Sequence, residues 1–440
     1  MIKGAANVSQ AVKNIGWRVT FAGLGINLAL GILYTWSVIK KGLPTDWSDT
    51  ERSLPYSVAC LVFCLVMVPA GRLQDKVGPR LVASVGGILV GIGMILASMW
   101  VTPMGILLGF GVLAGAGIGF GYASATPPAV KWFPSAKTGL IAGLVVSGFG
   151  LASVYAAPLA AWLNATYGLE KMLLSLGIAF LIVVVALAQL LAPPPKGYVP
   201  AGQPQPATNG ANGKKEEFTP KEMLGTLQFY LLWFMYACGA GAGLMIIGNL
   251  ARIGEDLTGK SLGFVLVAAL AVGNGGGRVA AGVISDKLGR QMTMFGFFVL
   301  QAVLILALSM FTPASPLASV AVLAVLSALI GANYGSNLAL FPSITKDYFG
   351  AKNFGMNYGL VFTAWGVGGF MLSLLAGQLR DRFDTLAFAY YGSAALLAVA
   401  AVMTFMVKPP HIAHSTAGQV GSDAIEEAGP ELEKAVAETA

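Results

Sequence analysis

One permanent cation, Arg278, lies in a stretch that is otherwise apolar from Leu262 to Ile284. An arginine at membrane depth costs several kcal/mol, from about 2.5 kcal/mol upward. A chain tolerates that cost where the guanidinium faces a water-filled cavity or an anionic partner. Three glycines, residues 275–277, precede Arg278 and would let another helix or a ligand approach the backbone closely. The pattern predicts that Arg278 binds a small carboxylate anion within the membrane.

A second interpretation of Arg278 is structural. The residue lies only two helical turns from the end of its apolar stretch, and a long arginine side chain can run along apolar surface to reach water. In that case the guanidinium would lie at the membrane surface and bind no ligand. Arginines that do this usually lie nearer the helix end, which favours the anion site.

Other apolar stretches carry polar or aromatic residues at helical spacing, so that these side chains share one face. A buried phenol needs a hydrogen-bond partner, and a tyrosine could donate to a carboxylate while its ring forms an apolar wall. For the glycines on the same faces, close helix packing is the favoured interpretation. We expect these side chains to line a cavity around Arg278: Tyr34, Tyr122, Tyr334, Asn337, Phe362 and Trp365.

The charge count narrows the class of anion. The apolar stretches contain one cation and no clear buried Asp, Glu or His. A dianion such as oxalate would be matched best by two cations, and Trp365 stands where a second might lie. A small monocarboxylate with an apolar end, of the lactate, pyruvate, formate or acetate type, fits one arginine and aromatic walls better.

The same count bears on mechanism. An empty carrier would have to close around an unpaired Arg278, and a bound carboxylate would neutralise the arginine and lower the cost of switching between outward-open and inward-open states. Anion exchange follows from this argument. Proton symport needs a group that binds H⁺, and the candidate is Asp381, near the outer end of the eleventh apolar stretch.

The composition supports a membrane location. The chain has 440 residues, of which 56% are hydrophobic and only 11% charged, with a mean hydropathy of +0.73. Soluble globular proteins carry about 25% charged residues, so we expect a multi-spanning membrane protein. The net charge of +7 lies in the loops between apolar stretches, which argues against nucleic-acid binding. Three cysteines in apolar stretches and two histidines in the C-terminal tail predict no disulfide, metal site or cofactor.

Twelve apolar stretches are each long enough to span a membrane. We predict an all-α membrane protein with two six-helix bundles, residues 17–192 and 224–408. A Pro-, Gly- and Asn-rich segment, residues 193–223, predicts a flexible cytosolic linker between them. The stretches run near 17–40, 54–71, 80–100, 104–131, 138–164, 169–192, 224–252, 261–285, 290–311, 316–345, 353–379 and 385–407.

The chain ends and the basic residues predict the orientation. The N-terminal segment, residues 1–16, shows no removable signal peptide, and the acidic tail, residues 409–440, predicts disorder. With the N-terminus inside, eighteen of the 27 Lys and Arg residues fall on the cytosolic side and eight outside. We therefore expect a multi-pass protein of the cell's inner membrane, in contact with lipid, with both termini cytosolic. We expect it to act as a monomer.

The two halves contain a repeated loop. The sequence GRLQDKVGPR begins at Gly71, and GVISDKLGR begins at Gly282, 211 residues later. KWF at residue 131, followed by Lys137 and Gly139, has a similar counterpart in KDYF at residue 346. These repeats argue for a duplicated carrier. An Asp in the loop can cap a helix start while the basic residues pair with it in the cytosol, so we expect a structural, gating role for Asp75, Arg80, Asp286 and Arg290.

The repeated loop resembles the signature of the major facilitator superfamily, and the resemblance covers all twelve stretches. It implies two pseudo-symmetric bundles that alternate between two openings. Within the superfamily, residues 131–150 and 346–369 resemble the branch of oxalate/formate antiporters and monocarboxylate transporters. The resemblance places the carboxylate-binding arginine of that branch on Arg278. Proton-coupled members carry an Asp four residues earlier, where this chain has Asn274, which we also include among the expected binding residues.

The resemblance implies a secondary active transporter of small monocarboxylates such as lactate or pyruvate, coupled to H⁺. One alternative is an oxalate/formate-type anion exchanger, and another, of a different class, is an anion sensor with a carrier fold that moves nothing. The sequence from Gly254 to Ser261 matches a P-loop pattern, but it joins two membrane stretches on the outer side, so we expect no nucleotide site. No intramembrane nucleophile or metal motif occurs, so we expect no enzyme activity.

Overall fold

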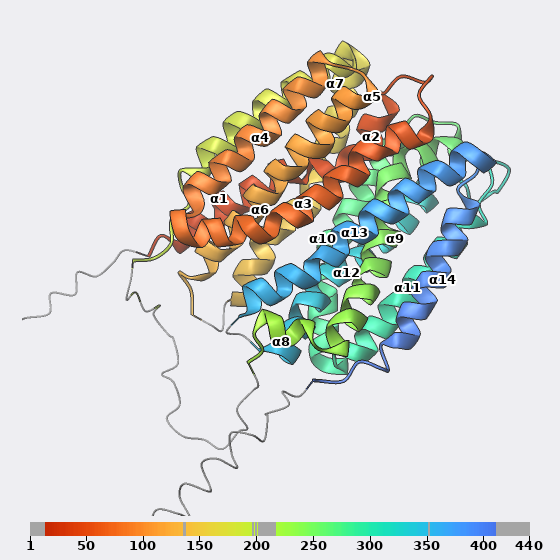
Figure 1. Cartoon of the computed structure of the whole chain (residues 1–440). Coiled ribbons are helices and arrows are strands. Elements are labelled where there is room, and N and C mark those ends of the chain that lie inside the picture. Colours follow the sequence, from red (N-terminus) through yellow and green to blue (C-terminus); the bar gives the residue numbers. More distant parts are fainter. Residues whose placement is uncertain are drawn as a thin grey trace, which may run out of the picture.

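The structure is a computed structural model that describes residues 14–134, 138–195, 198, 200, 217–350 and 353–410, without the side chains of Asp75 and Thr138. These residues form helices joined by short loops (Figure 1). The first half contains α1 (Gly16–Leu30), η1 (Gly31–Thr35), α2 (Trp36–Lys41), α3 (Asp49–Val77), α4 (Pro79–Met99), α5 (Pro103–Ile106), η2 (Leu107–Ala114), α6 (Gly115–Val130) and α7 (Thr138–Ala188). The second contains α8 (Pro220–Leu224), α9 (Leu227–Thr258), α10 (Gly263–Leu288), α11 (Arg290–Ser309), α12 (Val320–Phe349), α13 (Phe354–Phe383) and α14 (Ala387–Met403).

The helices account for the twelve predicted spans. Ten helices in the described part of the chain are long and apolar enough to cross a membrane. One of these, α7, contains two spans, because the backbone at Gly168 (φ 82°, ψ 170°) interrupts the helix. The apolar α14, of 17 residues, supplies the twelfth. The predicted all-α fold with twelve spans is confirmed.

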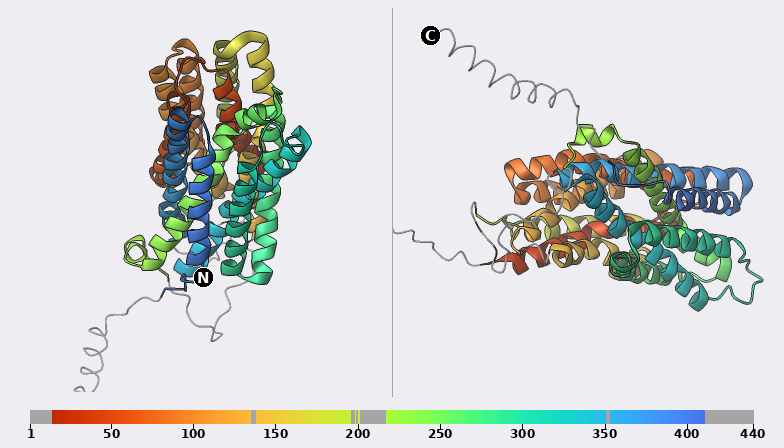
Figure 2. Two further views of the ribbon diagram at one scale, coloured as in Figure 1. Left: turned by 90° about the vertical axis from the view of Figure 1, so that its right-hand side faces the viewer. Right: turned by 90° about the horizontal axis from the view of Figure 1, so that it is seen from below.

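The two halves lie side by side and meet along three helix pairs. α3 packs on α13, α7 on α10, and α2 on α9. Figure 1 shows α3 running beside α13, and Figure 2 shows most helices running along one long axis. We call the end of the bundle where α1 begins and α14 ends the terminal face, and the opposite end the distal face.

Glycines allow close packing where the helices within each half meet. A Cβ on Gly277 would lie 2.1 Å from the carbonyl oxygen of Ala332, so α10 and α12 approach through their backbones. Gly115 and Gly119 of α6 approach α3 in the same way. The packing interpretation of these glycines therefore agrees with the structure. Because the small face of α10 is turned to α12, the neighbouring face with Arg278 is turned toward the other half.

The repeated loops adopt the same backbone conformation in both halves. Gly78 (φ 91°, ψ 158°) and Gly289 (φ 83°, ψ 157°) each end one helix and begin the next. Arg290 binds Asp286 (2.9 Å) and Asp347 (3.1 Å), which ties together α10, α11 and α12. In the first half, Arg80 donates from Nε to the carbonyl oxygen of Leu191 (2.8 Å). Arg290 thus pairs with the Asp of its own loop, whereas Arg80 binds a backbone carbonyl. The gating role expected for Asp75, Arg80, Asp286 and Arg290 stays a prediction.

The end of the segment predicted as a linker is ordered. Thr219 and Glu222 form a capping box that begins α8, a sequence signature that was missed. Phe218 is buried, and its carbonyl oxygen accepts hydrogen bonds from Asn353 and Asn357. The prediction of a flexible linker is therefore wrong for residues 217–223. The structure does not describe most of residues 193–216 of the predicted linker. It also does not describe residues 1–13 and 411–440.

The loop geometry predicts that Gly289→Ala lowers stability. Its backbone lies in a region open almost only to glycine, so a Cβ costs about 1–3 kcal/mol of unfolding free energy. Gly282→Ala is the matched control, because Gly282 is helical and nothing lies within 4 Å of a Cβ there. Thermal unfolding of both variants in detergent measures the difference. Equal unfolding midpoints would contradict the argument.

Candidate functional site

Arg278 lies between the two halves. Its Nε donates to Oδ1 of Asn274 (3.1 Å), one turn earlier on α10, and its Nη1 donates to the carbonyl oxygen of Val146 (3.1 Å) on α7. Because Asn274 lies further from the terminal face than Arg278, the side chain points into the bundle. This geometry contradicts the alternative in which Arg278 extends to the membrane surface.

Two hydrogen-bond donors at this site, one on the arginine and one on Asn274, have no acceptor among the described residues. Nη2 of Arg278 and Nδ2 of Asn274 are buried and have no hydrogen-bond partner among the described residues. An unsatisfied buried donor costs about 1–3 kcal/mol, and more when the group is charged. Since Nε–H needs an acceptor, the Asn274 amide must turn its oxygen to the arginine and leave its NH₂ free. A carboxylate, with two acceptor oxygens, could satisfy both donors.

The cavity next to Arg278 is small and mostly aromatic. Narrow gaps between its side chains leave about 180 Å³ of atom-free space. The ring centroids of Tyr34 and Phe149 are 5.0 Å apart, and those of Phe63 and Trp365 are 5.1 Å apart. Each half supplies four of the lining residues: Tyr34, Phe63, Tyr122 and Phe149 from the first, and Arg278, Leu338, Phe362 and Trp365 from the second.

Close backbone approach positions two of these groups. A Cβ on Gly31 would lie 2.5 Å from the carbonyl oxygen of Phe149, so the tightened η1 presses against α7 and holds Tyr34 over the cavity. On the other side, a Cβ on Gly150 would lie 3.3 Å from Nη2 of Arg278. The guanidinium therefore rests close against the backbone of α7, and a side chain at position 150 would have to displace it by a few tenths of an ångström.

The structure brings most of the predicted site residues together. Tyr34, Tyr122, Phe362 and Trp365 line the cavity with Arg278, and Asn274 binds the arginine. Tyr334 forms a layer behind them: its hydroxyl lies 2.6 Å from that of Tyr34 and accepts a hydrogen bond from Nε1 of Trp365 (2.7 Å).

Asn337 is the exception among the predicted residues. Its Nδ2 donates within α12 to the carbonyl oxygens of Asn333 and Tyr334, and its Oδ1 lies against Gly239 of α9. It does not line the cavity. Phe63, Phe149 and Leu338 also line the cavity and were not predicted, because an apolar side chain in an apolar stretch carries no signal that separates a cavity wall from ordinary packing.

Comparisons with known proteins agree with this architecture. A family model described as Major Facilitator Superfamily matches residues 21–323 and 232–432. The chain belongs to the major facilitator superfamily. It is therefore a membrane transporter and not an enzyme, as predicted.

Relatives of this major facilitator protein fall in the predicted branch. It is 30% identical to the oxalate:formate antiporter of Oxalobacter formigenes over 341 residues, 76% of this chain and 77% of that one. It is 26% identical to monocarboxylate transporter 11 of Mus musculus over 382 residues, 83% of this chain and 81% of that one. A solved bacterial homologue of the human lysosomal transporter Spinster shares the fold, with a TM-score of 0.60 and 16% identity over 88% of this chain and 97% of that one.

A second polar cluster in this major facilitator protein lies at the distal face. Lys40 is only 2% exposed, and its Nζ donates to Ser53 and to Asn249 of the other half (both 2.8 Å). Asp49 lies 3.7 Å from Lys40 and also pairs with Arg252 and Arg380 of the other half. The expectation that the spans hold one cation and no buried carboxylate is therefore wrong. Lys40 ends the first apolar stretch, and its burial depends on partners distant in sequence.

Asp381 belongs to the distal cluster and not to the cavity. Its carboxylate accepts from the backbone N–H groups of Asp49 (2.7 Å) and Thr50 (2.9 Å), and from the Thr50 hydroxyl. It thus caps the first turn of α3 from the other half. A role of Asp381 in proton coupling stays a prediction, and any such role would act at a distance from Arg278.

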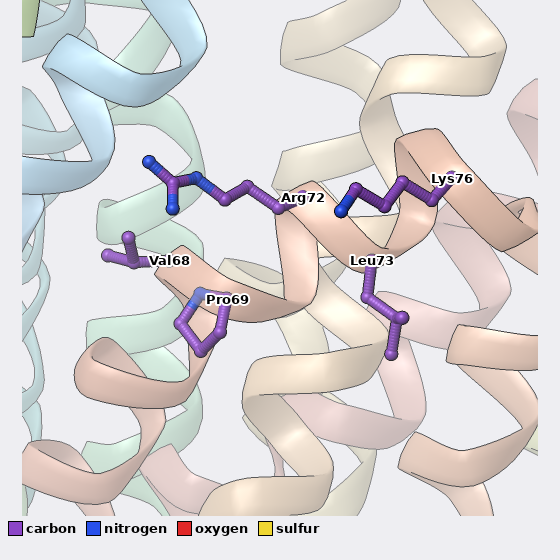
Figure 3. Close-up of a pocket in the computed structure, with 5 residues that line it drawn as sticks. All are labelled: Val68, Pro69, Arg72, Leu73 and Lys76. Carbon is purple, nitrogen blue, oxygen red and sulfur yellow. The ribbon is translucent and has the colours of Figure 1, made fainter.

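A recess opens at the terminal-face end of α3. It contains about 730 Å³ of atom-free space next to Val68, Pro69, Arg72, Leu73 and Lys76 (Figure 3). Val68, Arg72 and Lys76 follow one another at four-residue spacing and so share one face of α3. A Cβ on Gly359 of α13 would lie 3.7 Å from Val68, so this face is turned toward the other half. The terminal face therefore has an open recess bordered by two cations.

The tyrosine layer predicts a stability difference. Tyr334→Phe removes the hydroxyl that serves both Tyr34 and Trp365, which leaves buried donors unpaired at a cost of about 1–3 kcal/mol. Tyr155→Phe is the control, because its hydroxyl donates to Leu28 (3.0 Å) within one half and at an exposed position. Thermal unfolding in detergent should give a lower midpoint for Tyr334→Phe. A larger loss for Tyr155→Phe would refute this account of the layer.

Proposed function

We propose that the protein transports small monocarboxylates of the lactate or pyruvate type by alternating access around Arg278. The observation that carries the proposal is the buried, unpaired Nη2 of Arg278 beside the free NH₂ of Asn274. Of the residues that line the cavity, none is an Asp, Glu or His. The site therefore offers a net positive charge and two directed donors, which suit one carboxylate.

The walls and size of the cavity support a small anion with an apolar end. The lining side chains lie so close together that the atom-free gaps between them, about 180 Å³ in all, do not hold a water-sized sphere, so the rings must part to admit even a small anion. Six of the eight lining residues are aromatic, so the atoms beyond the carboxylate would contact rings. The Tyr122 hydroxyl could bind an α-hydroxy or α-keto oxygen, and the Tyr34 hydroxyl could do so in addition to its bond with Tyr334. The names of the two relatives, an oxalate:formate antiporter and a monocarboxylate transporter, support the same class.

The second buried cation does not change the expected charge of the substrate. Lys40 is paired with Asp49 and hydrogen-bonded to Ser53 and Asn249 at the distal face. It is not among the lining residues of the cavity. A dianion at Arg278 would keep one uncompensated negative charge, whereas a monocarboxylate leaves the site neutral.

We propose that the terminal face is cytosolic and that the protein lies in the inner membrane. The excess of Lys and Arg on that side supports this orientation. The distal cluster would then close the outer side, and the recess beside Arg72 and Lys76 would open to the cytosol. Since one chain supplies both walls of the cavity, a monomer is sufficient for transport.

A second candidate is anion exchange of the oxalate/formate type. It is favoured by a specific observation: Asn274 stands one turn from Arg278, and the cavity lining contains no carboxylate that could bind H⁺. Under exchange, the carrier would return only with an anion on Arg278. Under symport, a proton would have to bind outside the cavity, and Asp381 is the candidate.

Arg278→Ala should abolish uptake of labelled L-lactate into proteoliposomes while the protein still inserts and stays monodisperse. A hydrogen bond to a charged group contributes about 1.5–3 kcal/mol, so loss of the guanidinium weakens anion binding at least tenfold. Arg278→Lys, which keeps the charge and loses the fork that reaches Asn274 and Val146, should retain partial uptake. Wild-type uptake by Arg278→Ala would refute the proposed site.

The coupling is tested in the same proteoliposomes. Lactate uptake driven by an inward pH gradient, without internal anion, would support symport. Uptake that occurs only when lactate, formate or oxalate is present inside would support exchange. Binding of L-lactate to purified protein without any uptake would support the sensor and overturn the transport proposal.

A further inference from the structure

The distal cluster joins the two halves through one carboxylate. Oδ1 of Asp49 lies 2.5 Å from Nη1 of Arg252 on α9, and Oδ2 lies 3.2 Å from Nε of Arg380 on α13. Asp49 belongs to the first half and both arginines to the second. Its side chain is 11% exposed, so water screens these pairs less than it would on an open surface. One residue thus holds two helices of the opposite half.

A second carboxylate joins the halves in the opposite direction. Asp381 of the second half accepts three hydrogen bonds from the start of α3 in the first half. The two carboxylates meet at the same turn, since one partner of Asp381 is the backbone N–H of Asp49 itself. Each half therefore contributes one acidic side chain to the other, and both contacts must break before the distal ends of α3 and α13 can separate.

Most of the remaining charges around this turn also have partners within their own half, although Lys40 would lose its bond to Asn249 of the other half when the halves part. Lys40 on α2 stays beside Asp49, and Arg380 also binds Asp256 of α9 (2.7 Å). Arg52 of α3 donates to the carbonyl oxygen of Lys40 (3.0 Å). These groups lose few contacts when the halves part. At the edge, Lys41 adds one more cross-half pair with Glu255 (2.7 Å).

We propose that Asp49 and Asp381 together form the distal gate of this transporter, and that Asp49 sets how readily the gate opens. This inference rests on the proposed transport function and adds the residues that control one of its two openings. Asp49 is a gating residue and does not touch the substrate site. Loss of its charge releases Arg252 from its ion partner and weakens the hold on Arg380 at the same time.

The chain contains its own reporters of gate opening. Cys60 and Cys64 lie on α3 against α13: a Cβ on Gly366 would overlap Sγ of Cys64, and one on Gly369 would lie 3.3 Å from Cβ of Cys60. Both thiols are buried between the halves, about three to four turns below Asp49. A membrane-impermeant maleimide added outside intact cells should reach them only when the distal face opens. Cys238, the third cysteine, is replaced by Ala in all variants.

In this background, Asp49→Asn should raise the labelling rate about tenfold over the parent. A loss of about 1.4 kcal/mol from the free energy that holds the gate closed raises the population of the open state tenfold. Asp49→Glu, which keeps the charge, should label close to the parent rate. Glu51→Gln is the matched control: Glu51 lies on the same turn of α3, its carboxylate accepts only from Ser48 among the described residues, and its replacement should have no effect. Unchanged labelling of Asp49→Asn, or equal acceleration by Glu51→Gln, would overturn the proposal.

The partners on the other half give an independent check. Arg252→Gln should also accelerate labelling. The double variant Asp49→Asn/Arg252→Gln should label no faster than the faster of the two single variants, because both substitutions remove the same ion pair. Additive effects would contradict a shared contact. Labelling requires no substrate, so a failed gate and a failed transport proposal are distinguishable. If Arg278→Ala loses lactate uptake and Asp49→Asn leaves the labelling rate unchanged, the gate proposal is refuted and the transport proposal stands.

Discussion

An arginine without a fixed negative partner governs the organisation of this transporter. Arg278 lies where the two halves meet, bound to an amide of its own helix and to a carbonyl of the facing helix. Dipoles of this kind stabilise a buried cation without neutralising it. Under the proposed function, a mobile anion meets the electrostatic demand that remains at this site. A protein carboxylate in that place would improve stability and remove the reason to bind substrate.

The other features of the cavity follow from that charge. Aromatic rings exclude water and lower the local dielectric, which strengthens the attraction between the guanidinium and an incoming carboxylate. Gly150 and Gly31 bring α7 close enough to confine the arginine and Tyr34. Polar groups are few, and three of them bind one another: the hydroxyls of Tyr34 and Tyr334 and the indole N–H of Trp365. The free donors are thereby concentrated at Arg278 and Asn274.

The sequence predicted the features that depend on local pattern. Apolar length marked the twelve spans, and the repeated loops marked the latch of Arg290 with Asp286, which the structure contains. Arg278 was conspicuous because a charge in an apolar stretch has few explanations. Phe63 and Phe149 were not conspicuous, since an aromatic side chain in an apolar stretch has many possible explanations. Lys40 and Asp49 stand at segment ends, where charges are usually solvated, and only the tertiary contact with α9 and α13 buries them.

Three layers of polar contact cross between the halves along one path. The distal cluster around Asp49 comes first, then the hydroxyl pair of Tyr34 and Tyr334, and then the bond from Arg278 to Val146. A ligand can shift a conformational equilibrium only through contacts that differ between the states. A carboxylate on Arg278 touches the innermost layer directly and competes for the donor held by Val146. Three helical connections join the cavity to the distal cluster. η1 and α2 carry Tyr34 and Lys40, α3 carries Phe63 and Asp49, and α13 carries Trp365 and Arg380. A shift of any of these helices on occupancy of the cavity can therefore change the contacts of the outer layer.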